Sequence, residues 1–113
     1  MNITYCEQDK LLMAQIAEEI DHYTANKIRN RIDFEIEKCI PKKLYLDFKN
    51  VKFMDSAGIG LIIGRYKTMS MFGGSTYLIN VSNSVKKILE MSGITKIIPI
   101  VNKTGGIKDG KSI

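Results

Sequence analysis

The sequence of 113 residues has no tryptophan, one histidine, two prolines and two cysteines. Two cysteines, Cys6 and Cys39, are too few for a disulfide framework or a metal site. We therefore expect both thiols to be free and at least partly buried, in a reducing compartment. No apolar run approaches the roughly 18 residues that span a membrane. The N-terminus lacks a basic region followed by an apolar one, so we predict no signal peptide and a cytoplasmic location.

The charge has no strong local concentration. Seventeen Lys and Arg against twelve Asp and Glu give a net charge of +5, but no more than two basic residues are adjacent. Residues 103–113 carry three lysines and one aspartate, which is +2 of the total. Aromatic residues make up 8% of the chain and form no recognisable stacking surface. We expect no direct nucleic-acid binding and no membrane binding.

Apolar patterning in the first 41 residues predicts two strands and a helix. Residues 2–17 indicate a hairpin, and residues 18–23 indicate a polar loop. Thr24 is expected to cap a helix over about residues 25–39, because its hydroxyl can accept a bond from a free N–H of the first turn. Pro41 ends this helix. Its predicted buried stripe is Ile28, Ile32, Ile36 and Ile40, broadened by Phe34 and Cys39.

The second half of the chain alternates strands and helices. We predict strands over residues 43–48, 75–80 and 96–101, and helices over about 56–71 and 83–92. The helix after residue 55 has a predicted buried stripe of Ile59, Ile62, Ile63 and Tyr66. Gly60 and Gly64 are expected to allow close approach of the backbone to the sheet. The third helix is capped by Ser82, Asn83 or Ser84 and ends at Gly93.

These elements predict a single α/β domain of order β-β-α-β-α-β-α-β. Strands that alternate with helices are parallel with right-handed crossovers, so the sheet is mixed and mostly parallel, with helices packed against it. The domain is expected to cover residues 1–102, and residues 103–113 to form a flexible basic tail. We expect a monomer.

The segment from Phe53 to Gly60 is a strand-to-helix junction with a serine, Ser56, at the expected N-cap. Free N–H groups and the helix dipole favour negative charge there, so the serine could accept a phosphoryl group or serve only as a cap. A nucleophilic serine acting with Asp21 and His22 is an alternative, but Met54 stands where the Gly-x-Ser-x-Gly motif needs glycine. The glycines that follow do not match the dinucleotide fingerprint, which leaves weak nucleotide binding as a further alternative. We predict no enzyme activity, metal or cofactor.

The same segment resembles the signature of the STAS domain, which sulphate transporters share with anti-sigma factor antagonists. Residues 20–25, 82–87 and 91–98 resemble other parts of that family, so the resemblance covers about residues 2–101. The chain is most similar to the stand-alone antagonists of the sporulation type. Ala57 departs from the pattern, because close relatives often have a second hydroxyl residue there. The glycines after residue 104 argue against the further helix with which relatives commonly end.

The resemblance implies a switch in transcription regulation. The unphosphorylated protein would bind an anti-sigma factor that is also a serine kinase, and so free the sigma factor. Phosphorylation, which the resemblance assigns to Ser56, would end binding, and a serine phosphatase would reverse it. A STAS module of a general stress-signalling complex is the alternative. The expected partner-binding residues are Asp21, His22, Thr24, Asp55, Ser56, Ala57, Gly58 and Ile59.

Overall fold

The order of strands and helices predicted from the sequence is the order of the fold. The structure is a computed structural model, and it describes residues 1–101. The elements are β1 (Asn2–Cys6), β2 (Leu11–Gln15), α1 (Ala25–Cys39), β3 (Lys43–Asp47), α2 (Ser56–Met71), β4 (Ser75–Ile79), α3 (Asn83–Ser92), the 3-10 turn η1 (Ile94–Lys96) and β5 (Ile100–Val101). The single α/β domain is confirmed. The predicted flexible tail at 103–113 lies outside the described residues.

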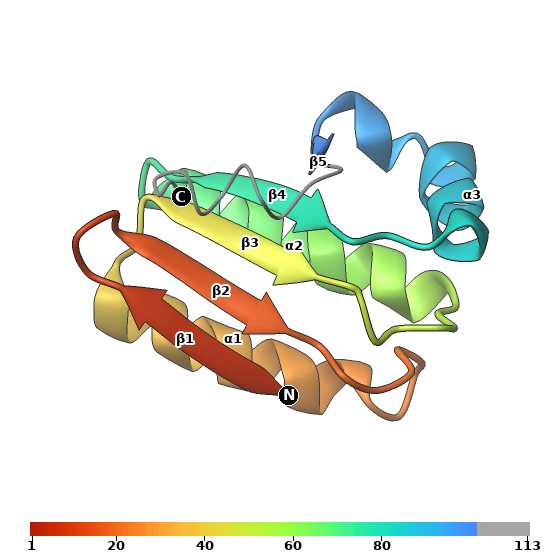
Figure 1. Cartoon of the computed structure of the whole chain (residues 1–113), viewed down its shortest axis with the longest axis horizontal. Coiled ribbons are helices and arrows are strands. Elements are labelled where there is room, and N and C mark those ends of the chain that lie inside the picture. The colour runs from red at the N-terminus through yellow and green to blue at the C-terminus, as the bar shows by residue number, and fades with distance from the viewer. Residues whose placement is uncertain (102–113) are drawn as a thin grey trace.

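The five strands form one mixed sheet in the order β1-β2-β3-β4-β5. β1 pairs antiparallel with β2, and the remaining neighbours are parallel. Helices α1 and α2 lie side by side against one face of this sheet, and α3 lies beyond the ends of β3 and β4 (Figure 1). Because the carboxyl ends of parallel strands meet at one edge, the loops after β2 and β3 reach the same end of the molecule.

Helix α1 buries a narrower stripe than its sequence predicts. Ile28, Ile32 and Ile36 are fully buried, as expected from their spacing of four. Phe34 is 63% exposed, because it stands two positions from this stripe, on the opposite side of the helix. Ile40 is 45% exposed, since it takes a left-handed conformation (φ 47°) and leaves the helix axis before Pro41. Both were wrongly expected in the core.

Helix α2 buries a wider face than predicted. Ile62 is buried as expected, but Leu61, Arg65 and Met69 are also buried, while Ile59, Ile63 and Tyr66 are half-buried around them. The width follows from two neighbours, because α2 packs against both the sheet and α1.

The prediction for Gly60 and Gly64 is wrong. A methyl group at either glycine would meet no atom within 4 Å. Close approach occurs instead at Gly58, beside Met54, and at Gly74, beside Met69 and a backbone carbonyl.

The last strand is shorter than predicted. Residues 96–101 were expected as a strand, but η1 occupies the chain to Lys96, and only Ile100–Val101 pair with the end of β4. Gly93 adopts the expected left-handed conformation (φ 82°). The cap of α3 is Ser82, whose hydroxyl accepts a hydrogen bond from the Val85 N–H at 3.3 Å.

Both cysteines are free, but only Cys39 is partly buried; Cys6 is exposed, against expectation, because it ends the edge strand β1 with its side chain away from the helices. None of the helices within residues 1–101 is long and apolar enough to cross a membrane.

Candidate functional site

Two loops that are 34 residues apart in the sequence are joined at the carboxyl end of the sheet. Ile20 and Met54 form an isolated parallel bridge. The Ile20 N–H donates to the Phe53 carbonyl at 3.1 Å, and the Asp55 N–H donates to the Ile20 carbonyl at 3.1 Å. Ile20 is fully buried, so residues 18–23 are not the uniformly polar loop expected from the sequence. This anchor places the segment from Asp21 beside the start of α2.

Asp55, rather than Ser56, caps helix α2. The extended Asp55 accepts a hydrogen bond from the Ala57 N–H at 2.8 Å through Oδ1. Ser56 is the first helical residue and is exposed. The expectation of a serine cap is therefore wrong by one position, because Asp55 has the extended backbone of an N-cap and Ser56 is already helical. The Ser56 hydroxyl has no capping role.

Gly58 is buried beneath the exposed serine. A Cβ at this position would lie 2.6 Å from Met54 Sδ and 3.0 Å from Met54 Cγ. Met54 is itself 1% exposed and belongs to the main core. The first turn of α2 can therefore lie this close to the core only with glycine at residue 58. Ile59 is half-buried against the same core, and Ala57 is half-buried.

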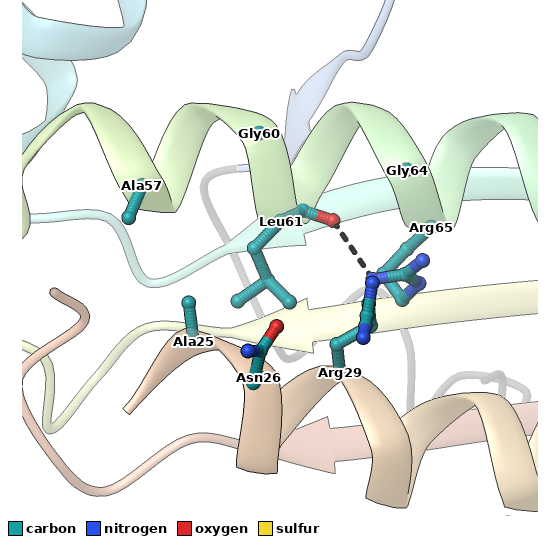
Figure 2. Close-up of a pocket in the computed structure, with 8 residues that line it drawn as sticks. All are labelled: Ala25, Asn26, Arg29, Ala57, Gly60, Leu61, Gly64 and Arg65. Carbon is teal, nitrogen blue, oxygen red and sulfur yellow. Dashed lines mark hydrogen bonds between the residues drawn. The ribbon is translucent and has the colours of Figure 1, made fainter. Parts of the chain in front are cut away.

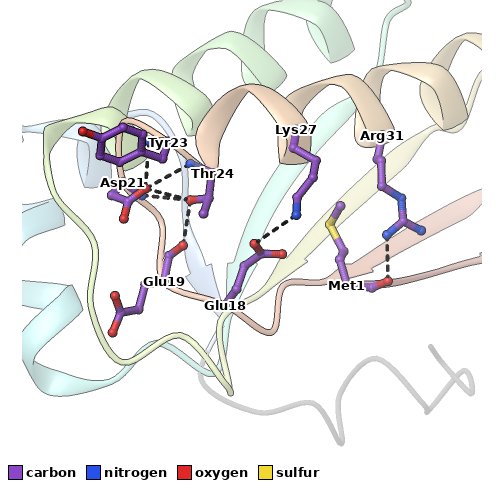
Figure 3. A network of polar contacts seen from close by, with 8 residues as sticks. All are labelled: Met1, Glu18, Glu19, Asp21, Tyr23, Thr24, Lys27 and Arg31. Atoms are coloured by element: carbon purple, nitrogen blue, oxygen red, sulfur yellow. Dashed lines mark hydrogen bonds and ion pairs between the residues drawn. The ribbon is translucent and has the colours of Figure 1, made fainter.

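The loop before α1 is held by reciprocal hydrogen bonds between Asp21 and Thr24 (Figure 3). Asp21 Oδ1 accepts from the N–H groups of Tyr23 at 2.9 Å and Thr24 at 3.0 Å. Thr24 Oγ1 accepts from the Asp21 N–H at 3.0 Å and donates to the Glu19 carbonyl at 2.8 Å. The hydroxyl of Thr24 therefore points back into the loop and does not cap the first turn of α1, against expectation.

The hydrogen bonds at Asp21 have an electrostatic consequence. The Thr24 and Tyr23 N–H groups, with the Thr24 hydroxyl and nearby His22, lower the pKa of the Asp21 carboxyl. Asp21 is therefore held as a carboxylate. With Asp55, it places two acidic side chains on the joined loops that present Ser56.

The residues proposed as a catalytic triad are arranged differently. The carboxylate of Asp21 binds backbone N–H groups, and the His22 ring packs edge-on against Tyr23, with centroids 5.5 Å apart. Within residues 1–101, no group of three His, Cys, Asp or Glu side chains could hold a metal ion.

Two exposed aromatic residues flank the site and were not among the predicted site residues. Tyr23 is 87% exposed and Phe53 is 50% exposed. They lie on the two loops that the Ile20 bridge joins. The presence of an aromatic residue, Tyr23, within a polar loop could have indicated a contact surface. At Phe53, the sequence alone could not distinguish an exposed ring from a buried one.

Comparisons with known proteins agree with this architecture. The STAS domain family model matches residues 2–106. The anti-sigma F factor antagonist of Paenibacillus polymyxa is 38% identical over 90 residues, which are 80% of this chain and 77% of that protein. The solved structure of the anti-sigma factor antagonist SpoIIAA in its unphosphorylated form has a TM-score of 0.81 at 25% identity and covers 99% of this chain and 96% of that one. The phosphorylated form of the Bacillus cell fate determinant SpoIIAA has a TM-score of 0.71 at 25% identity, covering 91% and 90%.

Proposed function

This chain belongs to the STAS domain family, and we propose that it acts as an anti-sigma factor antagonist whose binding is controlled by phosphorylation of Ser56. The observation that supports this most directly is the position of Ser56. It is exposed, it begins α2, and backbone hydrogen bonds tie its loop to the loop of Asp21 and Thr24. A protein partner that covers this surface would contact both loops at once.

The unphosphorylated surface suits a protein partner. It combines the neutral Ser56 hydroxyl with exposed His22 and the exposed rings of Tyr23 and Phe53. Exposed aromatic residues are frequent anchors of protein interfaces. The side chains of Asp21, Thr24 and Asp55 form hydrogen bonds with backbone N–H groups of the site itself. These bonds fix the shape of the surface. We therefore divide the expected partner residues: Ser56 and His22 contact the partner, and Asp21, Thr24, Asp55 and Gly58 hold the shape. Ala57 and Ile59 remain predicted contacts.

Phosphorylation would change this surface without unfolding it. The γ-phosphoryl group of ATP would form a bond to Ser56 Oγ as its bond to ADP breaks, and the hydroxyl proton would pass to a base of the kinase. The product adds about −1.5 to −2 charges at neutral pH. The start of a helix tolerates negative charge, so α2 stays folded. The partner would instead meet a bulky dianion next to the carboxylates of Asp55 and Asp21.

The partners follow from this cycle. We propose an anti-sigma factor with serine kinase activity as the binding partner and a serine phosphatase that restores the hydroxyl. The unphosphorylated chain would hold the anti-sigma factor and release its sigma factor. SpoIIAA has been solved in both an unphosphorylated and a phosphorylated form, which is the pair of states that the proposal requires.

The test is incubation with the anti-sigma factor kinase of the same organism and ATP, followed by intact mass. We expect one added phosphoryl group on the wild type and none on Ser56→Ala. Ser84→Ala is the matched control, because Ser84 is another exposed serine near the start of a helix. Labelling of Ser56→Ala to the same extent as the wild type would refute the assignment.

A further inference from the structure

A polar groove of about 270 Å³ lies between helices α1 and α2 (Figure 2). Small residues of α2 line one side, and two arginines, one from each helix, approach each other at one end. The lining includes Asn26, Arg29, Ala57, Gly60, Gly64 and Arg65. The groove is open because α2 presents no side chain at residues 60 and 64, where a methyl group would meet nothing within 4 Å.

Arg65 carries hydrogen-bond donors that the described residues do not use. The residue is 5% exposed. Its Nε lies 2.8 Å from Asp33 Oδ1, and Nη1 donates to the carbonyl of Leu61 at 3.4 Å. A guanidinium has five N–H donors, and these two contacts engage two of them, so Arg65 has donors left for an acceptor that enters the groove.

The charge of the groove favours an anion. Arg29, which is exposed, lines the same groove as Arg65, whose guanidinium is paired with Asp33. Burial lowers the pKa of Arg65, Asp33 raises it, and Arg29 lowers it again. Arg29, Arg65 and Asp33 together leave a formal charge of +1 at this end of the groove. Arginines bind carboxylates through paired N–H bonds, which supplies both charge and geometry.

The groove is continuous with the surface proposed to bind the anti-sigma factor. Ala57, which follows Ser56, lines it, and so does Ala25, which follows Thr24. No aromatic side chain lines the groove, so it offers no stacking surface for a nucleotide base. A carboxylate on a short side chain of a protein that already covers Ser56 could enter between the helices and reach both arginines.

We propose that the groove between α1 and α2 receives an acidic side chain of the protein partner, paired with Arg29 and Arg65. This inference rests on the proposed function, because the partner is the same anti-sigma factor. It adds a second contact, of defined charge, on the side of Ser56 that faces α1.

The test compares the affinity of the anti-sigma factor for two charge-reversal variants on the same helix. Arg29→Glu places a negative charge in the groove, and we expect it to weaken binding about tenfold or more. Arg31→Glu makes the same change of net charge outside the groove, since Arg31 bonds the Met1 carbonyl. We expect a loss of about fivefold or less there. Equal losses from the two variants would reduce the effect to general electrostatic attraction and overturn the proposal.

A second variant tests the space rather than the charge. Gly64→Leu places a large side chain in the groove. The backbone accepts this change, because a Cβ at residue 64 would meet no atom within 4 Å. We expect weaker partner binding with a melting temperature at or above that of the wild type. Unchanged affinity of a folded Gly64→Leu protein would contradict the proposal. A partner glutamate or aspartate changed to lysine should restore binding to Arg29→Glu, and failure of every such change would also count against it.

Two further outcomes separate this inference from its premise. If the wild type neither binds the kinase nor is phosphorylated at Ser56, the proposed function fails. If the wild type is bound and phosphorylated but Arg29→Glu behaves as Arg31→Glu does, only the groove inference fails. Inorganic phosphate and free glutamate are the remaining probes. If the NMR signal of the Arg65 Nε–H shifts and reaches a plateau when either ion is added to millimolar concentration, the groove is a small-anion site instead.

Discussion

Two glycines of helix α2, two residues apart, should respond to alanine with opposite signs. At Gly58 an added Cβ would lie 2.6 Å from Met54 Sδ, 3.0 Å from Cγ and 3.2 Å from Cβ. The sulfur can rotate away, but the Cβ of Met54 cannot move without the backbone. Such overpacking costs about 1–3 kcal/mol. Alanine recovers at most about 1 kcal/mol of helix propensity. We expect Gly58→Ala to lower the free energy of unfolding by about 1–2 kcal/mol.

Gly60→Ala is the matched control, because its added methyl group meets nothing within 4 Å. Gly60→Ala gains the higher helix propensity of alanine and creates no steric clash. We therefore expect the free energy of unfolding to rise by up to about 1 kcal/mol. Urea unfolding followed by circular dichroism measures both values, and the two variants should differ by about 1–3 kcal/mol. Equal changes at the two glycines would refute the claim that Met54 and Gly58 are in close contact. Gly58→Ala should also weaken partner binding, because the turn that presents Ser56 must shift.

Three further perturbations test the contacts around the site. Asp55→Ala removes the acceptor of the Ala57 N–H and should lower the free energy of unfolding, measured in urea, by about 1 kcal/mol. Asp55→Asn keeps an oxygen acceptor and should retain most of this free energy. The pKa of Asp21 is lowered in the folded state, so its stabilising contribution is complete above the ordinary value of 3.8 and is lost as the pH falls through the lower folded value. Urea midpoints measured from pH 7 to pH 3 should therefore fall more steeply for the wild type than for Asp21→Asn, and parallel curves would contradict this. Arg65→Met breaks the ion pair with Asp33 and should lower the free energy of unfolding by about 1–2 kcal/mol. The loss is smaller than for a fully buried pair, because the Asp33 side chain keeps an exposure of 29%. An unchanged melting temperature would show that the pair contributes nothing.

The sequence was sufficient for the elements that follow a regular apolar period. The spacing of Ile28, Ile32 and Ile36 predicted α1, and all three residues are buried. Gly93 marked the end of α3, because a left-handed residue there favours glycine. The parallel topology predicted from the sequence brings the loops that follow β2 and β3 to one end of the sheet, and the Ile20–Met54 bridge joins them there.

The features that were missed depend on contacts between distant segments. Asp33 of α1 pairs with Arg65 of α2, and no local sequence pattern connects the two residues. The predicted capping residue of α2 was wrong by one position. Asp55 and Ser56 are both favourable N-cap residues, and only the backbone conformation decides between them. Gly58 and Gly60 look alike in sequence, and their different roles follow only from the position of Met54.

A phosphate on Ser56 is expected to end binding to the anti-sigma factor. The most direct measurement is isothermal titration of the anti-sigma factor kinase, without ATP hydrolysis, with the unphosphorylated and the stoichiometrically phosphorylated chain. A loss of about 3 kcal/mol corresponds to a roughly 150-fold weaker dissociation constant, and we predict at least this order of change. Circular dichroism of the two forms should be the same, because α2 remains folded. Equal affinity of the two forms would contradict the account.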